Sequence, residues 1–221
     1  MNMGIISASR LRGSDFPSSG IIHRYLLNET TGTTANDSIG SENGIIKAGV
    51  TLGVDGYEAG GKAYEFDGAN NSYVSFNAYL GGLSNFTIYI RIRKNVIDSS
   101  TIFLAGWLGS NAIIIRTTAN VGDEAPSFTT VTNNGRIDLG LNSRPVSLDW
   151  VEYVVSYNGA IMTINVDGDY RTASQTGTLN PPNELRLGQL NSSLPGEFDC
   201  DEFIVWDRAL SEVEQNQTFI I

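Results

Sequence analysis

The sequence contains a single cysteine, Cys200, and a single histidine, His23. With one cysteine, no disulfide can form within the chain, so packing alone must hold the fold together. One histidine and one cysteine also cannot supply the ligands of a zinc site. A serine or cysteine nucleophile that depends on a histidine base would have to lie beside His23.

Positive charge is scarce as well: 14 Lys and Arg stand against 24 Asp and Glu, a formal net charge of −10. A groove for nucleic acid or a contact with an anionic membrane needs an excess of Lys and Arg, so both are disfavoured. No apolar run approaches the ~18 residues needed to span a bilayer. Residues 1–20 lack the apolar core of roughly 7–15 residues typical of a secretory signal, so we expect a chain that starts in the cytoplasm.

What the sequence does contain is alternation of apolar and polar residues. From Trp150 to Tyr157 this alternation has a period of two, which is typical of a strand with one buried face. Asn158 and Gly159 then supply the positive φ angles of a tight hairpin, and residues 161–166 alternate again. The segment therefore predicts an antiparallel meander.

Further strands are predicted along the chain, and only one helix. The predicted strands include residues 64–66, 73–76, 86–93, 101–107, 112–117, 127–132 and 136–139. In the strand 86–93 we expect one buried face, with Thr87, Tyr89 and Arg91 on the other. The helix is predicted over 211–218, with Ser211 as N-cap and Glu214 completing a capping box. We expect one all-β sandwich, residues 21–221, after an N-terminal arm of residues 1–20.

These segments carry a family resemblance that covers about residues 21–217. The matching residues are Ala63, Phe66, Asp67, Gly68, Trp150, Tyr157, Asn158, Gly159, Val166, Asp167, Gly168, Leu185, Gly188, Asp201, Glu202, Trp206, Arg208, Ala209, Leu210 and Ser211. In this order they resemble the laminin-G-like, concanavalin A-like lectin/glucanase family. The resemblance implies a two-sheet antiparallel jelly-roll sandwich with one short C-terminal helix, and a buried core residue at Trp150 and at Trp206.

The arm carries a second resemblance, because residues 4–13 are similar to the N-terminal segment of bacteriophage virion proteins. This implies a virion protein assembled in the host cytoplasm, with capsid or tail proteins as partners. The candidate docking residues are Ile5, Ile6, Arg10, Leu11 and Arg12. Such a segment can add a strand to a neighbouring subunit or dock on an acidic shell protein, with residues 17–20 as a hinge. The alternative is a first strand or flexible leader of the same domain.

Three carboxylates raise the question of catalysis. Glu197, Asp199 and Glu202 have the E-x-D-x-x-E spacing of the glucanase active strand. In a bulged strand all three could face a cleft, as retaining hydrolysis requires of its acid and nucleophile. However, Asp201 stands where glucanases have an apolar residue, and the string lies near the end of the chain. We therefore expect no catalytic residue here, and we expect Cys200 to be a buried, inert thiol.

Two kinds of binding site are also candidates. The loop with Asp37, Ser38 and Gly40 resembles the D-S-x-G loop of the family, and Asp37 with Asp201 could hold a structural calcium ion. The alternative is an ordinary Asx turn at Asp37 and a solvated Asp201. For a sugar, the candidates are Trp107 with Asn111, and Tyr79; the alternative for Trp107 is a core position at a strand end.

Together these features predict a non-enzymatic bacteriophage virion surface protein, a decoration or fibre-associated protein that presents a jelly roll for adhesion to host glycans. The alternatives are a carbohydrate-binding module of a bacterial glycan-processing system and, third, a glycoside hydrolase. Assembly into homo-oligomers stays open.

Overall fold

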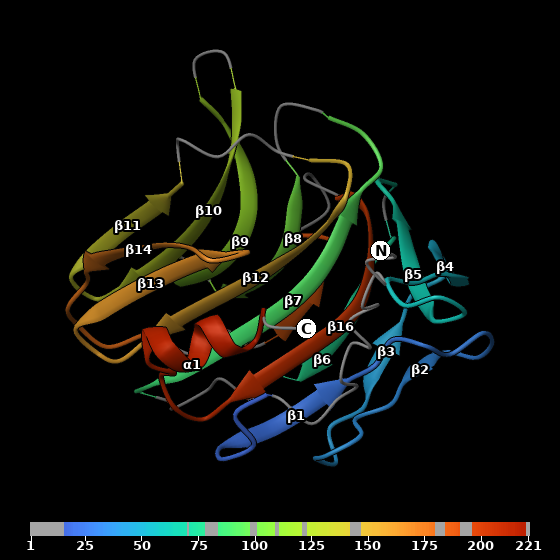
Figure 1. Cartoon of the computed structure of the whole chain (residues 1–221), viewed down its shortest axis with the longest axis horizontal. Coiled ribbons are helices and arrows are strands. Elements are labelled where there is room, and N and C mark those ends of the chain that lie inside the picture. Colours follow the sequence, from blue (N-terminus) through green and yellow to red (C-terminus); the bar gives the residue numbers. More distant parts are fainter. Residues whose placement is uncertain are drawn as a thin grey trace, which may run out of the picture.

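The computed structural model describes residues 16–69, 71–77, 84–97, 101–108, 111–120, 123–141, 147–179, 184–190 and 196–219. In these residues two antiparallel sheets pack face to face, with one short helix, α1 (Glu212–Gln217), near the C-terminus (Figure 1). The predicted jelly-roll sandwich is therefore confirmed.

The first sheet has the strand order β14-β13-β12-β7-β16-β5-β4, and β1 pairs with β16 beside this path. Its strands are β1 (Ile21–Tyr25), β4 (Val50–Asp55), β5 (Lys62–Asp67), β7 (Phe86–Lys94), β12 (Trp150–Tyr157), β13 (Ile161–Val166), β14 (Asp169–Ser174) and β16 (Glu197–Trp206). The predicted meander is β12-β13-β14. Its hairpin pairs Tyr157 with Met162, and Gly159 has a φ of 87°.

The second sheet has the order β11-β10-β9-β8-β15-β6-β3-β2. Its strands are β2 (Thr34–Ala35), β3 (Gly44–Ile46), β6 (Val74–Asn77), β8 (Ile102–Leu108), β9 (Asn111–Asn120), β10 (Asp123–Thr132), β11 (Gly135–Gly140) and β15 (Glu184–Leu187). β9 and β10 are longer than predicted and pair from Asp123 with Asn120 to Thr130 with Ile113. The edge strands β11 and β14 of the two sheets come into contact at one side of the sandwich (Figure 1).

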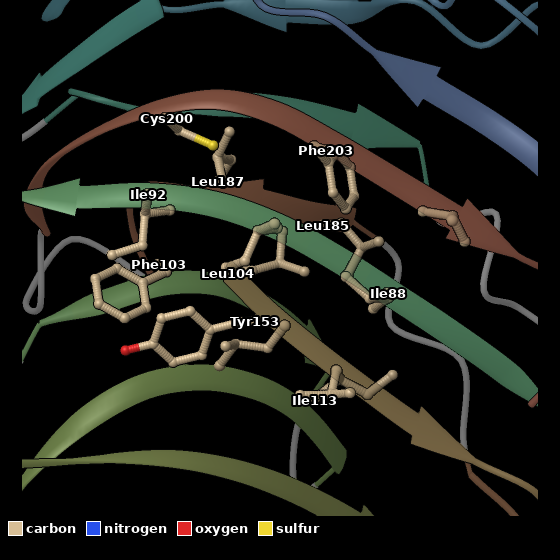
Figure 2. Close-up of a cluster of buried hydrophobic side chains, with 14 of the residues drawn as sticks. Ile88, Ile92, Phe103, Leu104, Ile113, Tyr153, Leu185, Leu187, Cys200 and Phe203 are labelled. Carbon is tan, nitrogen blue, oxygen red and sulfur yellow. The ribbon is translucent and has the colours of Figure 1, made fainter. Parts of the chain in front are cut away.

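The core lies between the sheets and follows the predicted alternation. Figure 2 shows Ile88 and Ile92 of β7 among side chains from the second sheet such as Phe103 and Leu185. Cys200 lies in this cluster and is fully buried, as predicted. Burial of these side chains is the main stabilising contribution in a chain without disulfides.

A second apolar cluster covers the outer face of the first sheet and corrects one prediction. Thr87, Tyr89 and Arg91, expected on an open face of β7, are 0%, 0% and 6% exposed. Phe16 and Leu210, from the two ends of the described chain, pack in the cluster that contains Tyr89. The strand is therefore buried on both faces.

The segment before β1, predicted as the hinge of the arm, is fixed to the end of β16. Trp206 Nε1 donates to the Pro17 carbonyl (2.7 Å) and Arg208 Nε donates to the Ser19 carbonyl (2.8 Å). The Asp207 amide donates to the Gly20 carbonyl (2.9 Å). Residues 16–20 therefore belong structurally to the domain. The docking candidates Ile5, Ile6, Arg10, Leu11 and Arg12 lie outside the described residues.

Helix α1 begins as predicted. Ser211 is the N-cap, its hydroxyl accepts from the Glu214 amide, and the Glu214 carboxylate accepts from the Ser211 amide, which is a complete capping box. Gln215 is buried and donates to the hydroxyls of Ser156 and Thr163, so the helix covers β12 and β13. Among the described residues, no helix is long and apolar enough to cross a bilayer.

Candidate functional site

The predicted carboxylate string lies on β16, and the strand is irregular where prediction required a bulge. Cys200 pairs with Ile92 and Glu202 pairs with Arg91, so Asp201 is an extra residue between them. Because Phe198, Cys200 and Phe203 fill the core, Asp199 and Glu202 point to the other face of the sheet. The extra residue therefore places Asp199 and Glu202 on the same face of β16, an orientation that the sequence allowed for a bulged strand.

The acids are engaged by arginines. Glu202 accepts from Arg91 Nη2 (2.7 Å) on one oxygen and from Arg24 Nε (2.9 Å) and Nη2 (2.7 Å) on the other. Asp199 accepts from Arg93 Nε (3.0 Å) and from Asn95 Nδ2 (3.0 Å). Asp199 is 3% exposed and Glu202 is 5% exposed, so neither carboxylate lies open to a substrate.

Arg91 is the centre of this buried polar network. Its guanidinium lies 4.6 Å from the centre of the Tyr57 ring, and its Nε donates to the Tyr89 hydroxyl (3.0 Å). The same Nε lies 3.4 Å from a Glu152 oxygen and 3.5 Å from Asp201 Oδ1. One cation is therefore shared by several acids, an arrangement that stabilises buried carboxylates only while Arg91 is present.

Asp201 is the carboxylate of the network that is least well compensated by hydrogen bonds and charge. Its Oδ2 accepts from the Tyr57 amide (2.9 Å), whereas its Oδ1 accepts no hydrogen bond from any described residue. Burial raises the pKa of Asp201 to about 7, because the charge of Arg91 offsets only part of the desolvation and Glu202 adds repulsion.

Asp37, the other predicted calcium ligand, holds its loop together. Its carboxylate accepts from His23 Nδ1 (2.6 Å) and from four backbone amides, those of Arg24, Ile39, Gly40 and Glu42. Burial raises the pKa of Asp37, but these hydrogen bonds outweigh it and hold the pKa below its ordinary value. The residue therefore forms the turn that the sequence offered as an alternative.

These contacts give Asp37 and Asp201 different partners. Five donors already point at the Asp37 carboxylate, so it does not fit a cation ligand in this structure. Within the described ranges, no three His, Cys, Asp or Glu side chains gather in a way that could hold a metal ion. A structural calcium ion stays a prediction, which thermal melts with added calcium and with a chelator would test.

The side chains of the predicted sugar-binding residues all lie outside the described side chains. Trp107 is the last residue but one of β8 and Asn111 begins β9, and the hairpin register pairs Trp107 with Ala112 and Leu108 with Asn111. The backbone thus brings Trp107 and Asn111 to one hairpin end, while their side chains and the whole of Tyr79 lie outside the description. Their role in binding stays a prediction.

Of the two other tryptophans, Trp206 is buried as the family resemblance implied, and Trp150 is not. Trp206 is fully buried in the outer cluster with Tyr89. Trp150 is only half-buried, with the Arg93 guanidinium 5.0 Å from its ring centre and the Tyr57 ring 6.3 Å away. The side chains of Trp150 and Trp206 therefore both lie on the outer face of the first sheet.

A pocket that the sequence did not predict opens where the edge strands of the two sheets meet, and we call it the edge pocket. Its volume is about 460 Å³. It is lined by Thr118, Ser127, Asp138, Leu139, Gly140, Arg171, Thr172 and Ala173. Arg171 Nη1 donates to the Gly140 carbonyl (2.6 Å), which links β14 of one sheet to β11 of the other. Hydroxyl and charged residues that alternate along a strand are typical of a solvent-exposed face. The sequence pattern of the lining residues therefore did not indicate a pocket.

Comparison with known proteins supports the fold. Residues 67–214 match the family profile described as the concanavalin A-like lectin/glucanases superfamily. No curated protein sequence matches the chain at a significant level.

Among solved structures, the receptor-binding domain of botulinum neurotoxin type G is similar with a TM-score of 0.69 and 13% identity, over 91% of this chain and 51% of that one. The binding domain of Paraclostridial Mosquitocidal Protein 1 gives a TM-score of 0.71 and 18% identity, over 90% and 52%. The binding domain of botulinum neurotoxin DC, solved in complex with SialylT, gives 0.69 and 14%, over 91% and 51%. This chain thus spans about half the length of these structures.

Proposed function

The chain belongs to the concanavalin A-like lectin/glucanase superfamily, and from this premise we propose that it is a non-enzymatic adhesion module on the surface of a bacteriophage particle. In this proposal the N-terminal arm anchors the chain to capsid or tail proteins, and the rigid sandwich binds glycans of the host surface. Toxin binding domains with the same fold, one of them solved with SialylT, support a binding role.

The observation that carries the binding role is the edge pocket. It is an open, polar hollow of about 460 Å³, within the range of roughly 300–1,000 Å³ typical of small-molecule sites. By contrast, Asp199 and Glu202, two of the three acids of the glucanase-like string, are buried and held by Arg93, Arg91 and Arg24. A hydrolase needs its acid and its nucleophile on either side of the scissile bond.

The anchor and the pocket can act independently, because they lie on different parts of the sandwich. The segment 16–20 is bonded to the end of β16, next to β7. The edge pocket includes β14, and β12 and β13 separate β14 from β7. A particle bound at the arm therefore leaves the pocket free for a ligand. The resemblance of residues 4–13 to phage virion proteins supports the particle as the anchor.

The test of anchoring compares the full chain with a variant that lacks residues 1–15. The deletion stops before Phe16, because residues 16–20 pack on the domain and their loss would confuse docking with folding. We expect mass spectrometry to detect the full chain in purified particles, and to detect the folded truncated chain only outside them. Incorporation of both chains would contradict the role of the arm, and incorporation of neither would contradict the virion assignment.

The test of adhesion is a glycan array with the full chain. Glycan binding without incorporation into particles would favour the alternative, a carbohydrate-binding module of a glycan-processing system. Release of reducing sugar from a bound glycan, lost in Glu197→Gln and Glu202→Gln, would instead establish a hydrolase.

A further inference from the structure

We infer that the edge pocket recognises an acidic saccharide and that it binds the carboxylate of the sugar through Ser127 and Arg171. This inference rests on the proposed adhesion function and names the ligand class and the residues of its site.

The first argument is that the pocket contains a buried hydroxyl group without a partner. Ser127 lines the pocket and is 2% exposed, yet its hydroxyl has no hydrogen-bond partner among the described residues. A buried polar group without a partner is unfavourable. The Ser127 hydroxyl therefore favours a ligand that accepts a hydrogen bond from it.

The register explains why the Ser127 hydroxyl stays uncovered. On its other side Ser127 pairs with Gly140 of β11, which has no side chain to lie over the hydroxyl. Arg171 reaches from β14 to the Gly140 carbonyl and so places its guanidinium at the same end of the pocket. A guanidinium carries five N–H donors, and this bond uses one of them.

The second argument is that the carboxylate in the pocket is already saturated. Asp138 accepts from Arg136 Nε (2.8 Å) and Nη2 (2.9 Å), from Arg116 Nη2 (3.4 Å) and from the Thr129 hydroxyl. Burial raises the pKa of Asp138, but the hydrogen bonds from Arg136 and Thr129 outweigh it and keep the pKa below its ordinary value. Asp138 therefore stays ionised and occupied, and the capacity left in the pocket consists mainly of donors.

The third argument is charge. The charged residues that line the pocket are Arg171 and Asp138. Arg116 and Arg136 bind Asp138 from outside the lining and neutralise it, so the charge of Arg171 is left for a ligand. A carboxylate on the ligand would complement both the donors and the charge.

The remaining lining fits a sugar ring. Thr118 and Thr172 present hydroxyl groups, while Leu139 and Ala173 present apolar atoms to the same hollow. A pyranose ring has hydroxyl groups on its rim and C–H bonds on its faces, so it can satisfy both kinds of wall. The volume of the pocket is enough for a small saccharide and too small for a long, compact oligosaccharide.

The experiment titrates the full chain with three probes, glucuronate, glucose and acetate, and follows backbone amide shifts by NMR. Glucuronate and glucose differ only in whether C6 is a carboxylate, and acetate carries the charge without the ring. We expect glucuronate to shift the amides of Ser127, Gly140 and Arg171, and to bind about tenfold or more tightly than glucose or acetate.

Two variants connect the binding to the pocket. Arg171→Gln should weaken glucuronate binding about tenfold, because it removes a charged donor, and Ser127→Ala should weaken it about fivefold. Lys62→Gln removes one exposed positive charge from β5, at the far side of the first sheet, and should leave the affinity unchanged. Equal melting temperatures of all three variants and the parent chain would show that folding is intact.

Each contrary result overturns the inference. If glucose binds as tightly as glucuronate, the carboxylate does not contribute to recognition. If acetate binds as tightly as glucuronate, the pocket is an anion site without preference for a sugar. If no probe shifts the amides, the pocket is not a binding site for these ligands. A glycan array in which the full chain binds neutral glycans, unchanged in Ser127→Ala, would overturn the inference while the adhesion function stands. An array without any bound glycan would count against adhesion itself.

Discussion

Asp201 shows how one residue can set the pH dependence of a domain. It is the extra residue of β16, about nine-tenths of its side chain is buried, and burial raises its pKa from 3.8 to about 7. The folded chain therefore holds this proton more tightly than the unfolded chain does. Its contribution to stability is fully present below pH 3.8 and is lost as the pH rises through about 7.

We predict that Asp201→Asn removes this pH dependence. As the pH rises from about 4 to about 7, the free energy of unfolding of the parent chain should fall relative to that of the variant, by on the order of 4 kcal/mol in total. Above that range the difference should stay constant. Urea unfolding at several pH values measures it, and Asp55→Asn, at an exposed acid of β4, is the control. Parallel stability curves for Asp201→Asn and the parent would contradict the prediction.

Cys200 gives a second prediction at this scale. It is fully buried among core side chains (Figure 2), and burial raises the pKa of its thiol well above the ordinary value. We expect a thiol-specific reagent to leave the native chain unlabelled and to label the chain once urea unfolds it. Rapid labelling under native conditions would mean that the core opens locally. Since the chain has one cysteine, the signal reports this position alone.

Among the elements, helix α1 depends on its cap. The Ser211 hydroxyl accepts from the Glu214 amide, and this is one of the orphan donors of the first turn. Ser211→Ala should therefore lower the free energy of unfolding by about 1 kcal/mol, as measured in urea. Ser18→Ala, at an exposed serine before β1, should have no measurable effect. An unchanged stability of Ser211→Ala would show that packing of Gln215 alone fixes the helix.

How far the sequence predicts an element depends on how local its causes are. The strands β12 and β13 and the capping box were predicted correctly, because alternation, Asn158-Gly159 and Ser211 act within a few residues. The burial of both faces of β7 was missed, because Phe16 and Leu210 cover it from distant parts of the chain.

The same reasoning applies to the site. The acids of β16 were found by their spacing, but their arginine partners come from β1 and β7 and carry no motif. The edge pocket depends on Gly140 lying opposite Ser127 and on Arg171 reaching across from the other sheet. Both are consequences of register and sheet packing, which a single sequence does not specify.

For the whole molecule, Phe16 fastens the beginning of the described chain to the outer face of the first sheet. Its ring lies 5.0 Å from that of Tyr89 and 6.3 Å from that of Trp206, with 7% of the residue exposed. Phe16→Ala should lower the free energy of unfolding by about 2–4 kcal/mol. Leu148→Ala, at a residue that is 48% exposed, should change it by less than ~0.5 kcal/mol. A small effect of Phe16→Ala, measured by urea unfolding, would show that this cluster contributes little.

The position of β16 has a consequence for the timing of folding. This strand pairs with β1, β5 and β7, so three strands of the first sheet depend on the last strand of the described chain. The ribosome synthesises β16 after every other described strand, and until then β7 lacks its neighbour on that side. Pairings between segments so far apart in sequence close slowly, on the order of milliseconds to seconds. Until β16 is synthesised, the nascent chain therefore exposes unpaired strand edges. A chain that stops before residue 197 should aggregate or be degraded instead of folding in part.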